Sequence, residues 1–521
     1  MQWPARFLSL INPRLQTSDN RLTEATQATA AAVKAKQASE AATLDRNLVR
    51  GIVWTGAGKW GSQVLSWAST LIVARLLTPA DYGVVGMAMI YLALITLLSE
   101  FGVGAAVINL QKLSHDQIAQ LNTVSLLVGA VSFVLSCAMA KPLGYFFHAP
   151  QVAAVVVVTS TGFLISAAQT VPYSLLQKDL RFKLLAGIEA FRAIVTAAAA
   201  IVMAFMGLGY WTLVLGGLLG TLLATILTVA ARPERFAVPR FSQLREALSY
   251  SNDILITRFA WYAFSNGDFL VAGRMLGGSA LGNYTLAWSI ASVPVEKVTA
   301  LISRVGPAFF SAVQHDKSEL RRYLAGLTEM LALIVFPVTA GLGLVSSDLV
   351  RVVFGPKWTG AILPLSLLSV AMAVRSITPL LPFVLNVVKE TRFSMWNSVA
   401  ASLILPLGFY LGSHWGTGGI ACVWATVYPI LMIPLFVRTL SRIDMRKRDY
   451  LRSIWPPLSS CMLMMATVLL VSHYVPSYWT PPIRLAIKVT TGAVSYAGAV
   501  LLLHRQALDR IRTAAKMLRS V

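Results

Sequence analysis

Residues 55–83 read TGAGKWGSQVLSWASTLIVARLLTPADYG, and residues 254–282 read ILITRFAWYAFSNGDFLVAGRMLGGSALG. The two stretches align without a gap at an offset of 199 residues. The aligned pairs include Lys59 with Arg258, Arg75 with Arg274, and Gly83 with Gly282. Chance seldom repeats a cation twice within one ungapped block of apolar helix. The match therefore predicts an internal duplication of the chain.

A second pair of similar segments lies further along each copy. Residues 172–182 read PYSLLQKDLRF, and residues 382–393 read PFVLNVVKETRF. Both follow the same kind of apolar run, at its cytoplasmic end. If each apolar run is one membrane-spanning helix, the chain divides into two halves of six helices, followed by two additional helices. Because the halves run in the same direction, they predict a pseudo-twofold axis along the membrane normal and a central cavity between them.

Composition decides the class of protein. Of the 521 residues, 56% are apolar and 13% are charged, whereas soluble proteins carry about 25% charged residues. The apolar residues form runs of about 20, the length at which a helix crosses the hydrocarbon core. The sequence therefore predicts an all-α integral membrane protein with about 14 transmembrane helices. The predicted spans are 52–77, 83–109, 117–139, 151–173, 188–206, 210–230, 252–276, 281–301, 325–347, 361–385, 394–411, 417–437, 453–474 and 481–503.

These spans give a simple domain organisation. The predicted parts are a cytosolic N-terminal arm (1–50), an N-terminal six-helix bundle (51–235), a C-terminal six-helix bundle (236–440), two additional transmembrane helices (441–505) and a basic cytosolic tail (506–521).

The net charge of +22 indicates orientation rather than nucleic-acid binding. With the N-terminus inside, the cytosolic segments hold 32 of the 44 Lys and Arg residues. The external loops hold only Lys141, Arg351, Lys357 and Arg484. This asymmetry follows the positive-inside rule, so both termini are expected in the cytosol. The basic clusters 442–452 and 505–519 are interpreted as topology determinants and contacts to anionic membrane lipids, and no nucleic-acid partner is expected.

Several familiar catalytic and metal-binding patterns are missing from the sequence. There is no GxxxxGK[ST] loop, HExxH or GxSxG motif. The three cysteines fall singly in predicted spans and predict no metal site. The longest segment outside the membrane is the arm of about 50 residues, too short for a transferase domain. An enzyme, an ATP-driven pump and a resident cofactor are therefore not expected.

Charged residues inside the spans are the candidate functional residues, because an ionisable group within the membrane is costly and usually faces protein or water. The cationic candidates for substrate binding in the cavity are Lys59, Arg258, Arg274, Lys297 and Arg375. The acidic candidates for coupling transport to H⁺ or Na⁺ are Glu100, Asp268 and Glu296. A cavity cation would bind a phosphate or an acidic sugar, and arginine offers a bidentate fork.

Structural roles stay open for the same residues. Lys59 and Arg258 lie near the cytoplasmic ends of their spans and can snorkel to the interface. Arg274 and its counterpart Arg75 lie near external ends, where holding the turn between two helices is the alternative. Lys297 and Arg375 lie deeper in their spans and can instead form buried ion pairs with Glu296, Glu100 or Asp268.

The segment ARLLTPADYG (74–83) and the following SEFGVGAAVINLQ (99–111) resemble the start of the bacterial polysaccharide transporter family. These are the Wzx-like oligosaccharide flippases of the MOP superfamily, and the resemblance is strongest to the exopolysaccharide and lipopolysaccharide branch. It extends over the whole chain in span number, topology and repeat. The implied fold is a MATE-like pair of six-helix bundles that works by alternating access.

The resemblance also implies a substrate and a place in the cell. The expected substrate is an undecaprenyl-pyrophosphate-linked repeat unit, carried to the periplasmic leaflet of the cell inner membrane for exopolysaccharide or lipopolysaccharide biosynthesis. Ion antiport is the expected driving force. Lys59, Arg258 and, less directly, Arg375 match the family's cavity cations by span, whereas Arg274 and Lys297 come from this sequence alone. A polysaccharide polymerase and a chain-length regulator are the candidate protein partners.

Three other classes remain as alternatives. A multidrug exporter of the same superfamily would share the span count, although its cavity would favour acidic residues for cationic drugs. A peptidoglycan-precursor flippase differs only in its substrate. A membrane-embedded polymerase or ligase would need a long external catalytic loop, and the external loops here have only about 12 residues.

Overall fold

The computed structural model describes residues 65–99, 103–109, 113–240, 262, 265–476 and 478–504. Every regular element within these ranges is helical, which confirms the all-α prediction. Eleven helical segments among the described residues are long and apolar enough to cross a membrane. The count of about 14 stays a prediction, because about half of the first and of the seventh predicted span lies outside the described ranges, and the helix that contains the eighth predicted span (281–301) is not among the eleven.

The first half of the chain forms one helical group. Its elements are a short helix (Leu65–Leu76), α2 (Pro79–Ser99), α3 (Val103–Asn109), α4 (His115–Phe146), α5 (Gln151–Lys178), α6 (Phe182–Phe205) and α7 (Trp211–Ala231). Helix α4 packs on α5, α6 packs on α7, and α5 lies between α4 and α7. The predicted span 83–109 contains most of α2 and all of α3, and residues 100–102 between them lie outside the described ranges.

The second half repeats this arrangement. Its elements are α9 (Gly267–Val271), the π-helix η2 (Ala272–Leu276), α10 (Gly277–Ala312), α11 (Lys317–Leu349), the π-helix η3 (Val350–Phe354), the 3₁₀-helix η4 (Pro356–Ala361), α12 (Ile362–Ile377), α13 (Leu380–Val387), α14 (Thr391–Ser413) and α15 (Gly416–Arg442). Helix α11 packs on α12, α14 packs on α15, and α12 also packs on α15. Each contact has a counterpart in the first half.

The second pair of similar segments forms the same turn in each half. Leu180 after α5 has φ of 54°, and Lys389 after α13 has φ of 62°. In both turns a backbone N–H reaches back five residues, from Arg181 to Leu176 and from Glu390 to Leu385. This left-handed residue with a long backward bond is the Schellman ending of a helix. The sequence similarity thus encodes a helix stop.

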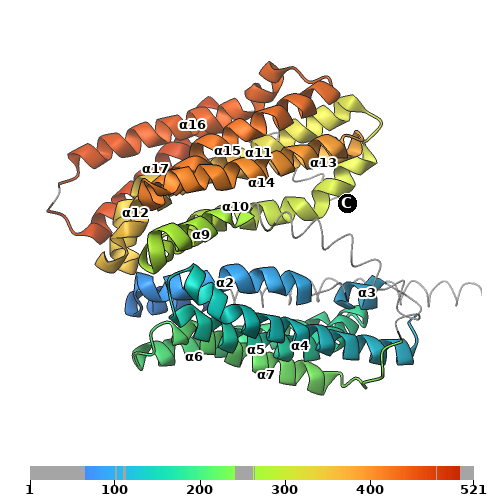
Figure 1. Cartoon of the computed structure of the whole chain (residues 1–521). Coiled ribbons are helices and arrows are strands. Elements are labelled where there is room, and N and C mark those ends of the chain that lie inside the picture. Colours follow the sequence, from blue (N-terminus) through green and yellow to red (C-terminus); the bar gives the residue numbers. More distant parts are fainter. Residues whose placement is uncertain are drawn as a thin grey trace, which may run out of the picture.

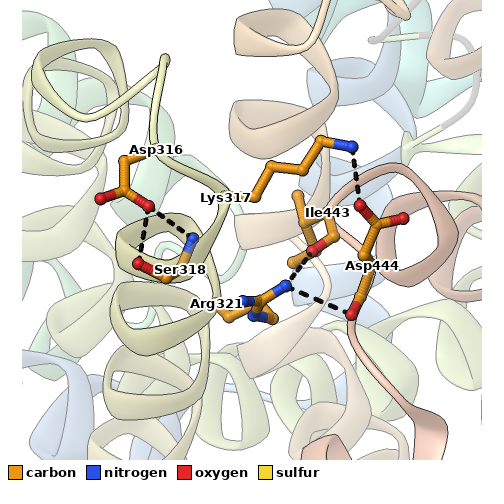
Figure 2. Close-up of polar contacts among 6 residues, drawn as sticks. All are labelled: Asp316, Lys317, Ser318, Arg321, Ile443 and Asp444. Atoms are coloured by element: carbon orange, nitrogen blue, oxygen red, sulfur yellow. Dashed lines mark hydrogen bonds and ion pairs between the residues drawn. The ribbon is translucent and has the colours of Figure 1, made fainter.

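Two additional helices, α16 (Lys447–Tyr474) and α17 (Pro481–Leu503), pack on α11 of the second half. Polar contacts hold the turn before α16, as Figure 2 shows: Lys317 Nζ donates to Asp444 Oδ2 at 2.7 Å, and Arg321 Nη1 donates to the carbonyls of Ile443 and Asp444 at 3.1 and 3.3 Å. Asp316 caps the same end of α11 through Ser318. The helix pair is therefore attached to the second half.

A buried ion cluster holds the other end of the added helices. Asp348 of α11 is 3% exposed and accepts from Arg484 Nη2 at 2.8 Å and from Lys488 Nζ at 2.7 Å, both on α17. Arg484, counted in an external loop from sequence, lies in the first turn of α17. A cation at that depth needs a carboxylate partner, because an isolated buried charge is costly.

The two halves lie one above the other and approach each other most closely at one end, on the left of Figure 1. Helix α2, α9 and the start of α10 lie there. Toward the right of the view, where α3 and α13 lie, the two groups diverge. One cluster of buried apolar residues includes members of both halves, such as Met87 and Val155 with Leu281 and Trp358. The core of the molecule thus joins the halves near the end where they meet.

Candidate functional site

Two glycines lie where α2 crosses α10. A Cβ atom built on Gly83 would lie 1.8 Å from the carbonyl oxygen of Gly278, and one built on Gly282 would lie 1.8 Å from that of Pro79. Real Cβ atoms do not approach an oxygen so closely, so only glycine fits at either position. The offset of 199 residues converts one contact into the other. We call the end of the molecule that holds this crossing the crossing end, and the opposite end the far end.

Trp358 of η4 closes over this crossing. Its side chain is fully buried, and Nε1 donates to the carbonyl oxygen of Ala74 in the first half at 2.8 Å. Its ring meets that of Tyr82 edge to face, with centroids 5.1 Å apart. A buried indole satisfied by a backbone carbonyl of the other half contributes both apolar area and a directed hydrogen bond. This residue ties the two halves together.

Arg274, one of the predicted substrate cations, also lies at the crossing end. Its Nη1 contacts the ring of His148, with 2.7 Å to Nε2, and its guanidinium lies 5.3 Å from the centroid of Phe146. Both partners follow or end α4 of the first half. In this conformation the side chain bridges the two halves, a contact that was not predicted from the sequence. Substrate binding by Arg274 stays a prediction.

The far end has ion pairs of a different kind. Arg232 after α7 lies 3.6 Å from Asp179 in the turn between α5 and α6. In the second half, Arg438 and Arg442 of α15 contact Glu390, with Arg438 Nη2 at 3.0 Å. The two groups occupy equivalent places, because each joins the Schellman turn to the last helix of its own six-helix half. Each pair stays within one half.

Arg375 of α12 lies among aromatic rings in the second half. Its guanidinium carbon is 4.9 Å from the centroid of Trp288, 4.6 Å from that of Trp424 and 5.9 Å from that of Tyr428. Nη1 is buried and has no hydrogen-bond partner among the described residues. Aromatic faces attract the cation and hold it in place without neutralising its charge. The group therefore keeps donor capacity for an anion.

Asp268 of α9 lies next to this group. It is fully buried, and its carboxylate accepts from Tyr284 Oη at 2.7 Å, from Trp424 Nε1 at 2.8 Å and from its neighbour's backbone N–H at 2.9 Å. These three donors are neutral, so they satisfy the carboxylate oxygens without cancelling a negative charge. Trp424 contacts both groups, because its ring faces Arg375 while its N–H binds Asp268. The predicted ion-coupling residue Asp268 and the predicted substrate-binding residue Arg375 thus contact the same tryptophan.

The remaining predicted residues are more scattered. Glu296 and Lys297 are both exposed on α10. As neighbours in sequence they point to different sides of that helix. Lys59, Arg258 and Glu100 lie outside the described residues. Within the part of the chain that the structure describes, no group of three or more His, Cys, Asp or Glu side chains is positioned to hold a metal ion.

Sequence reasoning did not single out Trp358 or Tyr284. Neither carries a charge or a motif that distinguishes it from the many aromatic residues of the chain. Their roles depend on which backbone carbonyl or carboxylate lies opposite, and that is decided by packing between distant helices. A buried aspartate in an apolar helix was the one available signal that a donor such as Tyr284 must lie nearby.

Comparison with known proteins agrees with this architecture. The family described as "Polysaccharide biosynthesis protein" matches residues 72–363. The lipopolysaccharide biosynthesis protein WzxC of Escherichia coli is 26% identical over 80% of this chain and 85% of its own length. The teichuronic acid biosynthesis protein TuaB of Bacillus subtilis is 25% identical over 87% of this chain and 95% of its own.

Two solved structures share the fold. The lipid II flippase MurJ in an inward closed conformation covers 88% of this chain and 100% of its own, with a TM-score of 0.66 and 14% identity. An inward-facing multidrug resistance MATE family transporter of the MOP superfamily covers 73% of this chain and 94% of its own, with a TM-score of 0.59 and 15% identity. The MOP-superfamily fold expected from sequence is thereby confirmed. Because the family match spans more than half of its length, this chain belongs to the polysaccharide biosynthesis protein family, a family of membrane transporters related to the Wzx-like flippases.

Proposed function

We propose that this protein is a flippase that moves undecaprenyl-pyrophosphate-linked oligosaccharide repeat units from the cytoplasmic to the periplasmic leaflet of the bacterial inner membrane. Family membership and the names of its relatives in lipopolysaccharide and teichuronic acid biosynthesis support this substrate class. The exported glycan would serve exopolysaccharide or lipopolysaccharide biosynthesis. A polymerase and a chain-length regulator are the proposed partners after export.

The observation that carries the proposal is the position of the contacts between halves. The crossing end contains the starts of α2 and α10 and the loops after α4 and α11, all of which the distribution of Lys and Arg assigns to the periplasm. In this orientation the halves meet on the periplasmic side and diverge on the cytoplasmic side. That is the conformation that would accept a headgroup from the cytosol. Export then requires the crossing to open and the far end to close.

Arg375 is the best described candidate for holding the headgroup. Its aromatic neighbours fix the guanidinium, and its Nη1, unpartnered within the described part of the chain, offers a donor to a pyrophosphate oxygen after a small movement. Lys59, Arg258 and Lys297 are proposed to add positive charge along the path. The polyprenyl tail would stay in the lipid beside the halves, because its burial in a charged passage is unfavourable.

Asp268 is the proposed site of ion coupling. A carboxylate with neutral donors only can take up H⁺ or bind Na⁺, and either event would change the charge beside Arg375. Binding and release of the ion at Asp268 would then bias the equilibrium between the conformations open to the cytoplasmic and to the periplasmic side. Glu100 and Glu296 remain secondary candidates.

The test is to delete the gene and extract lipid-linked oligosaccharides for mass spectrometry while measuring extracellular polymer. We expect pyrophosphoryl-undecaprenyl repeat units to accumulate and polymer to disappear. Accumulated lipid II would instead indicate a peptidoglycan-precursor flippase. Unchanged lipid pools together with drug sensitivity would indicate a multidrug exporter.

The same assay tests Arg375. Replacing it by glutamine should lower polymer export about tenfold, because one charge-assisted contact to phosphate is lost, while Arg375→Lys should retain part of the activity. Arg351→Gln is the matched control, since it removes one exposed arginine elsewhere in the same half. Normal export by Arg375→Gln at equal protein levels would remove this residue from the substrate site.

A further inference from the structure

Arg75 reaches from the first half to the end of a helix in the second. Its Nε donates to the carbonyl oxygen of Val353 at 2.7 Å, and its Nη2 contacts the carbonyl oxygen of Val352. Both carbonyls belong to η3, which continues α11 to its C-terminal end. The last carbonyls of a helix have no partner within it, and the helix dipole places partial negative charge there. A forked cation is suited to this position.

Arg274 reaches from the second half to the first, where it contacts side-chain rings rather than backbone carbonyls. It is the repeat counterpart of Arg75, and its partners His148 and Phe146 lie at the C-terminal end of α4. Helices α4 and α11 are equivalent third helices of their halves. Each arginine therefore sits at the negative end of the equivalent helix of the other half.

The residues that precede the two arginines, Ala74 and Gly273, also contact the opposite half. Ala74 accepts the hydrogen bond of Trp358, and its counterpart Gly273 packs so closely against Phe147 that a Cβ atom added there would lie 3.1 Å from the ring. Two successive positions of the repeat thus contact the opposite half in the same sense. A chance surface ion pair would not recur at both ends of a 199-residue offset.

We propose that Arg75 and Arg274 are paired latches that hold the crossing end closed, and that losing both shifts the protein toward the conformation open at that end. This inference rests on the proposed alternating-access function. Each latch joins residues of different halves, so the contacts must break when the halves separate there. The far-end pairs Asp179 with Arg232 and Glu390 with Arg438 lie within halves and can persist through the movement.

The experiment measures distances between spin labels in purified protein reconstituted in lipid nanodiscs. In a background with the three cysteines replaced by alanine, one label pair is placed on Met206 and Trp415, which are 71% and 76% exposed and lie in crossing-end loops of the two halves. A second pair is placed on Val238 and Met395 at the far end, 83% and 51% exposed. No substrate is added.

Four versions are compared: the unmodified background, the single variants Arg75→Gln and Arg274→Gln, and the double variant. The matched control is the double variant Lys141→Gln and Arg351→Gln, which removes two exposed cations from the same end and leaves both latch side chains and their acceptor groups in place. Arg75→Lys retains the charge but cannot donate to two carbonyls at once.

We expect the double variant to gain a longer distance between the crossing-end labels and a shorter one between the far-end labels. The ratio of open to closed protein should rise about tenfold, since each cation at a helix end contributes modestly. Each single variant should change the label distances less than the double variant does, and the control should give the same distances as the background. Arg75→Lys should fall between the background and Arg75→Gln.

Identical distance distributions in the double variant and the background would overturn the proposal. A loss of defined distances within each half would indicate misfolding, so a label pair on Met206 and Val238, both in the first half, is measured in parallel and should not change. Because the readout needs no glycolipid, it is independent of the substrate. A deletion strain with normal lipid pools would refute the flippase function while leaving the latch result standing.

Discussion

The crossing end and the far end of the molecule use the same kinds of residue for opposite purposes. At the crossing end, repeat-related arginines bind the other half, and at the far end, repeat-related ion pairs stay within one half. Duplication therefore produced two sets of equivalent contacts that differ in whether they cross the pseudo-twofold axis. In the proposed alternating-access cycle, contacts that cross the axis break when the halves separate, whereas contacts within a half can persist. Mutations at the two ends should therefore differ in their effects on export and on unfolding.

The crossing glycines should be the most sensitive positions. Gly83→Ala or Gly282→Ala places a methyl group where a backbone oxygen lies, so α2 and α10 must move apart. Polymer export should fall to the level of the deletion strain, with the crossing-end labels further apart. Gly217→Ala in α7 is the control, because a methyl group there meets no described atom within 4 Å. Normal export by both crossing variants would mean that this helix contact is not required.

Asp348 tests a contact that lies near the crossing end and joins the second half to the added helix α17. Asp348→Asn leaves the partly buried Arg484 and Lys488 without a carboxylate, which should lower the free energy of unfolding by about 3 kcal/mol. Thermal unfolding in detergent measures this loss. Lys488→Met should cost less, since Arg484 still pairs with Asp348. An altered crossing-end label distance in either variant would contradict the assignment to stability alone.

Glu390 tests the far end. Glu390→Gln removes the partner of Arg438 and Arg442, whose side chains are 40% and 45% exposed, so we expect a loss of about 1 kcal/mol in unfolding free energy. Asp179→Asn in the corresponding turn of the first half should cost less, because the pair with Arg232 is longer at 3.6 Å and more exposed. The melting temperatures of Glu390→Gln and Asp179→Asn, each measured against the parent protein, test this order. A larger effect from Asp179 would show that the halves are not equivalent at this end.

Acid pH should weaken the turn before α16. The ammonium of Lys317, which donates a hydrogen bond to Asp444, lowers the pKa of that carboxyl below its usual 3.8. A depressed pKa in the folded state gives stability that is complete above the unfolded value and is lost as the pH falls through the folded value. The difference in melting temperature between the parent and Asp444→Asn should therefore shrink as the pH falls below 3.8, the usual pKa of the carboxyl. A difference that persists there would assign the effect to something other than this ion pair.

Much of the fold was predictable from local patterns. The apolar runs predicted helices, and the segments PYSLLQKDLRF and PFVLNVVKETRF marked two equivalent helix stops that the structure describes after α5 and α13. These features depend on neighbouring residues only. By contrast, the predicted span 361–385 contains both the end of α12 at Ile377 and the start of α13 at Leu380, which shows that hydrophobicity alone does not indicate where a helix ends.

The candidate site was only partly predictable. The cost of a charge in the membrane identified Arg375 and Asp268, and the structure brings both to Trp424. The same reasoning grouped Arg274 with Arg375 because both are intramembrane arginines. Their different surroundings depend on which helices meet, and the position of a charge in the sequence carries no information about that.

The sequence by itself determined that this chain spans a membrane many times. It also indicates a duplication and predicts which end of each helix faces the cytosol. The apolar composition, the repeat at an offset of 199 residues and the distribution of Lys and Arg are sufficient for these conclusions. Insertion into lipid depends on each segment separately, so it can be read from the sequence. Only the tertiary structure decided that Arg75 and Arg274 bind the opposite half whereas Glu390 binds its own. Such a choice depends on the relative position of helices more than a hundred residues apart, and it is set by close packing at Gly83 and Gly282 rather than by any local preference.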